Sequence, residues 1–97
     1  MARRFLIVSY DVTSDRRRER LAQVLQDYGD RVQYSVFCCQ LSAREKVQMQ
    51  QRVKAQMNQQ EDRVLLLDAG PVVGQLPEPD VDYLGRPYKP SARTQVV

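Results

Sequence analysis

The residues best suited to chemistry in this chain are one aspartate and a cluster of arginines near the N-terminus. Asp11 follows the apolar run at residues 5–9, where a buried strand should give way to a loop. The next charged cluster contains four arginines within five positions, Arg16, Arg17, Arg18 and Arg20. A carboxylate can bind a hard cation, and guanidinium groups can bind phosphate, so the pair fits metal-assisted chemistry on a nucleic-acid backbone.

The residue types also limit what this site could be. The chain contains no histidine, so Asp11 has few competitors, and a metal-activated water would have to act as the base. Mg²⁺ prefers six oxygen ligands, for which a single aspartate is a small contribution. A two-fold dimer would bring a second copy of Asp11 to the axis. The structural alternatives are a turn or cap role for Asp11 and a solvated helix face for the arginines.

Length and composition indicate one small cytoplasmic domain. The chain has 97 residues and a net charge of +3, so the local density of arginines says more than the total charge. A chain of this length can form only a modest hydrophobic core, and we expect a homodimer to bury further apolar surface. No apolar stretch approaches the roughly 20 residues that cross a bilayer. The adjacent Cys38 and Cys39 are best explained as small strand residues on opposite faces of a sheet.

The first half of the chain predicts a strand followed by a helix. Residues 4–10 form a continuous apolar run, which is typical of a central strand covered by helices. Ser14 or Asp15 can cap a helix that presents one apolar face, formed by Leu21, Val24, Leu25 and Tyr28. We expect Gly29 to end that helix in the left-handed conformation.

The second half predicts more strands and another helix. Residues 31–41 have strong strand character and can form one strand or two joined by a tight turn. Ser42 and Glu45 match a capping box, and the helix after them should run to about Met57 with a thin apolar stripe. Residues 63–67 form a last core strand. The order predicts an α+β, ferredoxin-like βαββαβ sandwich, residues 1–69, with both helices on one face of the sheet.

Residues 70–97 form a proline-rich C-terminal tail. Five prolines and three glycines in residues 70–90 disfavour regular structure, except for short strands near Tyr83 and at residues 94–97. We expect this tail to dock on the dimer partner. Glu78, Asp80 and Asp82 could form a second metal cluster, but their proline-flanked setting favours a solvated loop.

Two motifs together carry a family resemblance. The sequence Y-D-V before the arginine-rich helix start, followed by D-Y-G-D-R-V-Q-Y-S-V-F, resembles the CRISPR-associated endoribonuclease family Cas2. The resemblance covers nearly the whole chain through Leu67, and V-D-Y-L-G-R-P in the tail is also similar to some members. It implies a small ferredoxin-like homodimer of the CRISPR adaptation machinery, with Mg²⁺-dependent cleavage of RNA or duplex DNA. It also implies an adaptor role with the CRISPR integrase dimer in spacer acquisition.

The resemblance further assigns individual positions. Asp11, from both subunits, matches the metal-ligand aspartate and is the expected catalytic residue. Tyr10, Arg17, Arg31 and Phe37 match positions that look functional. Arg16 and Arg18 complete the nucleic-acid-binding set, because the resemblance leaves open which of the three consecutive arginines binds the phosphate. For Phe37, packing in the core or at the dimer interface is favoured over base stacking.

These observations leave three functional hypotheses. The first is an antiviral-defence nuclease in which Asp11 binds Mg²⁺ and nearby arginines hold the nucleic acid. The second is a non-catalytic DNA-binding adaptor of the integrase complex, with the same arginines on duplex phosphates. The third is an RNA-binding module of similar topology, which is weakened because the chain lacks the aromatic RNA-recognition strand motif.

Overall fold

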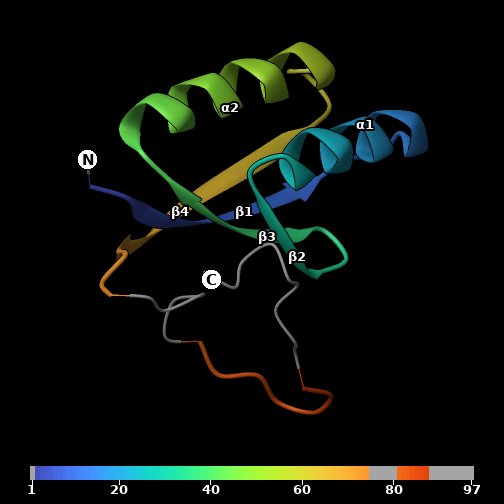
Figure 1. The fold of residues 1–97 in the computed structure, drawn as a ribbon. Coiled ribbons are helices and arrows are strands. Elements are labelled where there is room, and N and C mark those ends of the chain that lie inside the picture. The colour runs from blue at the N-terminus through green and yellow to red at the C-terminus, as the bar shows by residue number, and fades with distance from the viewer. Residues whose placement is uncertain (1, 75–80, 88–97) are drawn as a thin grey trace.

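The computed structural model describes residues 2–74 and 81–87 and confirms the predicted ferredoxin-like arrangement. The elements in chain order are β1 (Arg4–Asp11), α1 (Asp15–Gln26), β2 (Gly29–Gln33), β3 (Val36–Leu41), α2 (Ala43–Gln56) and β4 (Arg63–Pro71). The strands form one antiparallel sheet in the order β2-β3-β1-β4. Both helices cover the same face of this sheet (Figure 1).

Strand β1 lies in the centre of the sheet, as its apolar sequence predicts. It pairs with β3 on one side and with β4 on the other. Leu6, Val8 and Tyr10 point into the core between the sheet and the helices, together with Phe37 of β3. Because successive side chains of a strand point to opposite faces, the residues between them point away from the helices.

The two helices begin where their capping residues predict. Ser14 is the N-cap of α1, and its hydroxyl accepts a hydrogen bond from the Arg17 backbone N–H at 3.3 Å. Ser42 and Glu45 form the predicted capping box of α2. The predicted apolar faces are also confirmed, since the core contains buried residues of both helices, Leu21, Val24, Leu25, Met49 and Val53.

The segment at residues 31–41 forms part of a β-hairpin rather than one strand. Tyr34 and Ser35 make the turn between β2 and β3. The predicted role of Gly29 is wrong, because α1 is capped by Asp27 and Gly29 is not among the glycines with positive φ. Gly29 instead begins β2 opposite Cys39, where a Cβ atom would lie 2.3 Å from the carbonyl oxygen of Cys38. Glycine is needed there for close packing of β2 on β3.

The C-terminal elements differ from the sequence-based expectation in two places. Strand β4 continues to Pro71, beyond the predicted end at Leu67, because its backbone pairs with β1 as far as Arg4. Residues 81–87 contain no strand. Gly85 has a φ of 89°, which interrupts an extended backbone, and Pro87 has no N–H group for strand pairing. The other expected strand, at residues 94–97, lies outside the described residues. Within the described ranges, no helix is long and apolar enough to cross a membrane.

We predict that Gly29→Ala destabilises the hairpin. The added Cβ would also lie 2.7 Å from the Cys39 sulfur, and two of the three closest contacts are with β3 backbone, which cannot rotate away. Overpacking of this kind costs about 1–3 kcal/mol in the free energy of unfolding, which urea titration measures. Gln33→Ala, at the exposed end of the same strand, is the control and should change this free energy by less than about 0.5 kcal/mol. Equal stability of both variants would contradict the close-packing role.

Candidate nucleic-acid and metal site

The structure places the adjacent residues Tyr10 and Asp11 on opposite faces of the sheet. Tyr10 is 4% exposed and packs in the core beneath the helices, whereas Asp11 is exposed at the end of β1. This separation follows from the two-residue repeat of a strand. The residues predicted from sequence as one site are therefore divided between the helix-covered face and the opposite face. We call the opposite face the uncovered face, because neither α1 nor α2 lies over it (Figure 1).

On the uncovered face, Asp11 lies beside a cation that the sequence analysis did not select. Arg63, the first residue of β4, is directly opposite Asp11 in the β1–β4 register. Directly opposite residues of an antiparallel pair share a face, so their side chains are neighbours. Within residues 2–74 and 81–87, neither side chain makes a hydrogen bond or ion pair. A carboxylate and a guanidinium are thus both available at this edge.

Arg17 is committed to a structural ion pair rather than left available for phosphate. Its guanidinium donates two hydrogen bonds to Asp62, at 2.8 and 3.0 Å, and a third to Glu61 at 3.1 Å. The Asp62 side chain has no exposed surface, and it also accepts the backbone N–H of Asn58 at 2.8 Å. These bonds connect the start of α1 to the loop before β4. The hydrogen bonds from Arg17 lower the pKa of Asp62 below its usual value.

The other two candidate arginines of this cluster differ from Arg17. Arg18 donates to the Val12 carbonyl at 2.8 Å and forms an ion pair with Asp15, so its position is fixed at the start of α1. Arg16 is exposed and makes no ion pair or hydrogen bond within the described part of the chain. A positive charge in the first turn of a helix interacts unfavourably with the helix dipole, and at Arg17 and Arg18 the acidic partners offset this effect.

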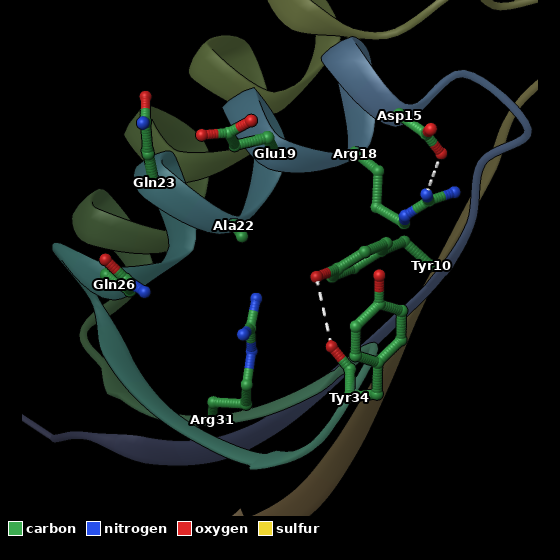
Figure 2. A pocket seen from close by; sticks show the side chains of 9 residues that line it. All are labelled: Tyr10, Asp15, Arg18, Glu19, Ala22, Gln23, Gln26, Arg31 and Tyr34. Carbon is green, nitrogen blue, oxygen red and sulfur yellow. Dashed lines mark hydrogen bonds and ion pairs between the residues drawn. The ribbon is translucent and has the colours of Figure 1, made fainter.

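Arg18 and Arg31 line a cleft between α1 and the β2–β3 hairpin (Figure 2). The cleft has a volume of about 580 Å³. Tyr34 stands at one side, with the guanidinium carbons of Arg18 and Arg31 at 5.9 and 5.8 Å from its ring centroid. The Tyr10 hydroxyl reaches the same cleft and donates to the Tyr34 carbonyl at 3.4 Å. Asp11 is not part of its lining.

Phe37 occupies the position expected of a core residue. It is fully buried, and its ring stacks on that of Tyr10 with the centroids 6.3 Å apart. The guanidinium carbon of Arg31 lies 5.3 Å from the Phe37 ring centroid. Phe37 therefore packs in the core, as one of the two predicted roles requires. A base could stack on its ring only if this part of the core opened.

The other candidate metal ligands form no metal site within the residues that the structure describes. No group of three or more metal-ligating side chains is found within residues 2–74 and 81–87. Asp82 is exposed, while Glu78 and Asp80, its expected companions, lie outside the described residues. Cys38 and Cys39 are buried in β3 and are not joined in a disulfide, consistent with the structural role predicted for them. Asp11 has an exposed, unpaired carboxylate, which is the donor type that Mg²⁺ prefers.

Sequence patterns alone did not single out Arg63, Asp62 or Tyr34. Arg63 and Asp62 are far from residues 11–17 in sequence, and only strand pairing and loop packing bring them there. Tyr34 could have been found as the aromatic residue at the centre of a possible hairpin turn. Its importance depends on Arg18 and Arg31, which come from different elements.

The family model and the curated relatives that match this chain belong to the same family. The model of the family described as CRISPR associated protein Cas2 matches residues 4–71. A curated relative from Geobacter sulfurreducens, named CRISPR-associated endoribonuclease Cas2, is 35% identical over 91 residues, which cover 94% of both chains.

Two solved structures are similar over most of the chain. A hypothetical protein from Thermus thermophilus has a TM-score of 0.75 and 34% identity, and the match covers 92% of this chain and 99% of that one. Streptococcus pyogenes Cas2 has a TM-score of 0.68 and 28% identity, and the match covers 84% and 99% of the two chains.

We predict that Asp62→Asn lowers the midpoint of thermal unfolding at pH 7 by several degrees, because Arg17 loses its buried anionic partner. The pKa of Asp62 is lowered on folding, so its contribution is complete above the unfolded value near 3.8 and is lost as the pH falls through the folded value. The difference between wild type and variant should therefore shrink below pH 3.8. Asp27→Asn, which breaks the exposed pair with Arg52, is the control and should have little effect. A difference that is the same at pH 3 and pH 7 would contradict this role of the ion pair.

Proposed function

Because the chain belongs to the Cas2 family of CRISPR-associated proteins, we propose that it is a cytoplasmic, homodimeric, Mg²⁺-dependent nuclease that takes part in spacer acquisition with the CRISPR integrase dimer. Its substrate is a phosphodiester bond of single-stranded RNA or duplex DNA. The observation that carries this proposal is the exposed, unpaired Asp11 carboxylate at the end of β1, beside Arg63 on the uncovered face of the sheet.

The residues at this edge fit the proposed chemistry. The Asp11 carboxylates of two subunits would hold Mg²⁺, which would supply an activated water and charge stabilisation at the phosphate. Arg63 would bind a non-bridging phosphate oxygen next to Asp11, since it lies directly opposite Asp11 in the β1–β4 register. Arg16, exposed at the start of α1, offers a second contact to the backbone.

The uncovered face of the sheet supports the proposed dimer. Leu65 and Leu67 of β4 point away from the helices and are 53% and 56% exposed. Ile7 of β1 lies directly opposite Leu67, so the apolar surface continues across two strands. Two copies packed through this face would bury these side chains and bring the Asp11 residues of β1 into one interface. The C-terminal tail, residues 70–97, would add contacts by docking on the partner.

A second candidate function is the non-catalytic DNA-binding adaptor of the integrase complex. It is favoured by the lack of a metal-binding cluster around Asp11, because no group of three or more metal-ligating side chains is found in the described part of the chain. In this role Arg16 and Arg63 would bind duplex phosphates without cleavage. The two functions differ in whether Asp11 is needed for activity on nucleic acid.

Replacing Asp11 by asparagine tests the nuclease directly. We expect Asp11→Asn to reduce Mg²⁺-dependent cleavage of labelled RNA and duplex DNA by at least about 100-fold, because the metal contributes several kcal/mol to stabilisation of the transition state. Removal of Mg²⁺ with EDTA should have the same effect on the wild type. Dimerisation and nucleic-acid binding, measured by light scattering and fluorescence anisotropy, should be unchanged.

The matched control is Asp68→Asn, which removes an aspartate from the other end of β4 and should cleave like the wild type. Cleavage that persists in Asp11→Asn would reject the nuclease and indicate a contaminating enzyme. Loss of cleavage with normal spacer acquisition in cells would support the adaptor as the physiological function.

A charge on the uncovered face tests the dimer. Leu67→Glu should convert the dimer to a monomer in light scattering, because the new carboxylate would be buried without a partner. Val47→Glu, on the outer surface of α2 and 52% exposed, is the control and should stay dimeric. If Leu67→Glu remains a dimer while Val47→Glu does not, the interface lies on the helical face instead.

A further inference from the structure

The cleft between α1 and the β2–β3 hairpin contains two opposite charges that the proposed active site does not use. Arg31 and Glu19 both line it, and neither makes an ion pair or hydrogen bond in the part of the chain that the structure describes. They are therefore too far apart to bind each other, with open space between α1 and β2 (Figure 2). A ligand between them would need an acceptor edge facing Arg31 and a donor edge facing Glu19.

The same cleft provides an aromatic surface. The Tyr34 side chain is 70% exposed, although two guanidinium groups lie within 6 Å of its ring centroid. Its backbone is held in place, since the Tyr34 carbonyl accepts the Tyr10 hydroxyl from the core. An exposed, positioned tyrosine beside guanidinium groups is the arrangement on which an unpaired base stacks.

The charges of the lining favour a base over a phosphate. Arg18 is already neutralised by Asp15, and Glu19 opposes Arg31, so the four charged groups sum to zero. Phosphate would gain little from such a cleft. A base has no net charge and is recognised by hydrogen bonds at its edges.

Guanine matches this pair of side chains better than the other bases. Its O6 and N7 atoms form a pair of acceptors for an arginine, and its N1–H and N2–H₂ groups form a pair of donors for a carboxylate. Cytosine offers the carboxylate one donor group. Adenine and uracil present neither two adjacent acceptors to the arginine nor two adjacent donor groups to the carboxylate. The amides of Gln23 and Gln26 complete the polar lining.

We propose that the α1–β2 cleft binds an unpaired guanine of a single-stranded nucleic acid, with Tyr34 stacking on the base, Arg31 binding O6 and N7, and Glu19 accepting from N1 and N2. This inference rests on the proposed nucleic-acid substrate and adds to it a base preference. A duplex cannot supply this ligand, because its bases are stacked and their Watson–Crick edges are paired. The cleft lies on the helix-covered side, away from Asp11.

The test measures the affinity of the full chain for fluorescein-labelled octamers by fluorescence anisotropy. The octamers are oligouridine with one central G, A or C, as RNA and as the corresponding DNA. Measurements without Mg²⁺, in the Asp11→Asn background, prevent cleavage. We expect the octamer with guanine to bind at least about fivefold more tightly than the others, in either sugar form.

The cleft variants separate stacking from edge recognition. Tyr34→Ala should weaken binding of every single strand by about tenfold, whereas Tyr34→Phe should retain it. Arg31→Gln and Glu19→Gln should remove the preference for guanine. Arg44→Gln, an exposed arginine on α2 outside the cleft, is the charge-matched control and should keep the preference. Circular dichroism verifies that each variant is folded.

Equal affinity for all three central bases, or a guanine preference that survives Arg31→Gln, would overturn the proposal. If a guanine mononucleotide displaces the octamer at equal concentration, the ligand is a free nucleotide and not a base of a single-stranded nucleic acid. These outcomes are independent of the nuclease. If the wild type does not cleave nucleic acid but its binding still depends on Tyr34 and Arg31, the guanine site is supported and only the proposed cleavage is rejected.

Discussion

The burial of one face of the sheet beneath two helices determines where every candidate functional group lies. Burying a large apolar side chain stabilises a protein by about 1.5–3 kcal/mol. In this chain Leu6, Val8 and Phe37 all lose nearly all their exposed surface on that face. A shift of one residue in β1 would move its apolar set into solvent, so the register is strongly specified. Asp11 must then point to the uncovered face, because Tyr10 points to the covered one.

The same constraint separates two kinds of recognition. The uncovered face has an available carboxylate and guanidinium at one end, Asp11 and Arg63, next to exposed leucines. The covered side has a cleft at the edge of α1, whose charges sum to zero and whose wall is an exposed tyrosine. The uncovered face is suited to chemistry on the nucleic-acid backbone, and the cleft is suited to recognition of a base. The two surfaces share no lining residue, so each can be altered without loss of the other.

The three consecutive arginines at the start of α1 differ in the groups that their side chains contact. Arg16, Arg17 and Arg18 are consecutive and look equivalent as a cluster, yet each faces a different environment on the helix. Arg17 binds a carboxylate with no exposed surface, and Arg18 binds a carbonyl and Asp15. Arg16 makes no such contact within the described residues. A charge that is already hydrogen-bonded is a poor phosphate ligand, because binding would first require its present bonds to break.

Several features of the fold could be predicted from the sequence because their causes are local. The caps at Ser14 and Ser42 depend on backbone groups within three residues, and the apolar faces of both helices follow from the helical repeat. The family motifs around Asp11 and Arg31 are likewise contiguous. Gly29 shows the limit of this approach. Its position after a helix predicts a left-handed cap, but contact with β3, which lies nine or ten residues away, decides its role.

Sequence alone determined the element order, the family and the prominence of Tyr10-Asp11 near a group of arginines. Tertiary structure alone decided which of those residues share a surface. Strand pairing placed Arg63 beside Asp11, loop packing assigned Arg17 to Asp62, and the hairpin brought Tyr34 to Arg18 and Arg31. The physical reason is that hydrogen bonds and ion pairs act over a few ångströms of space. Only the folded chain makes residues distant in sequence neighbours at that range.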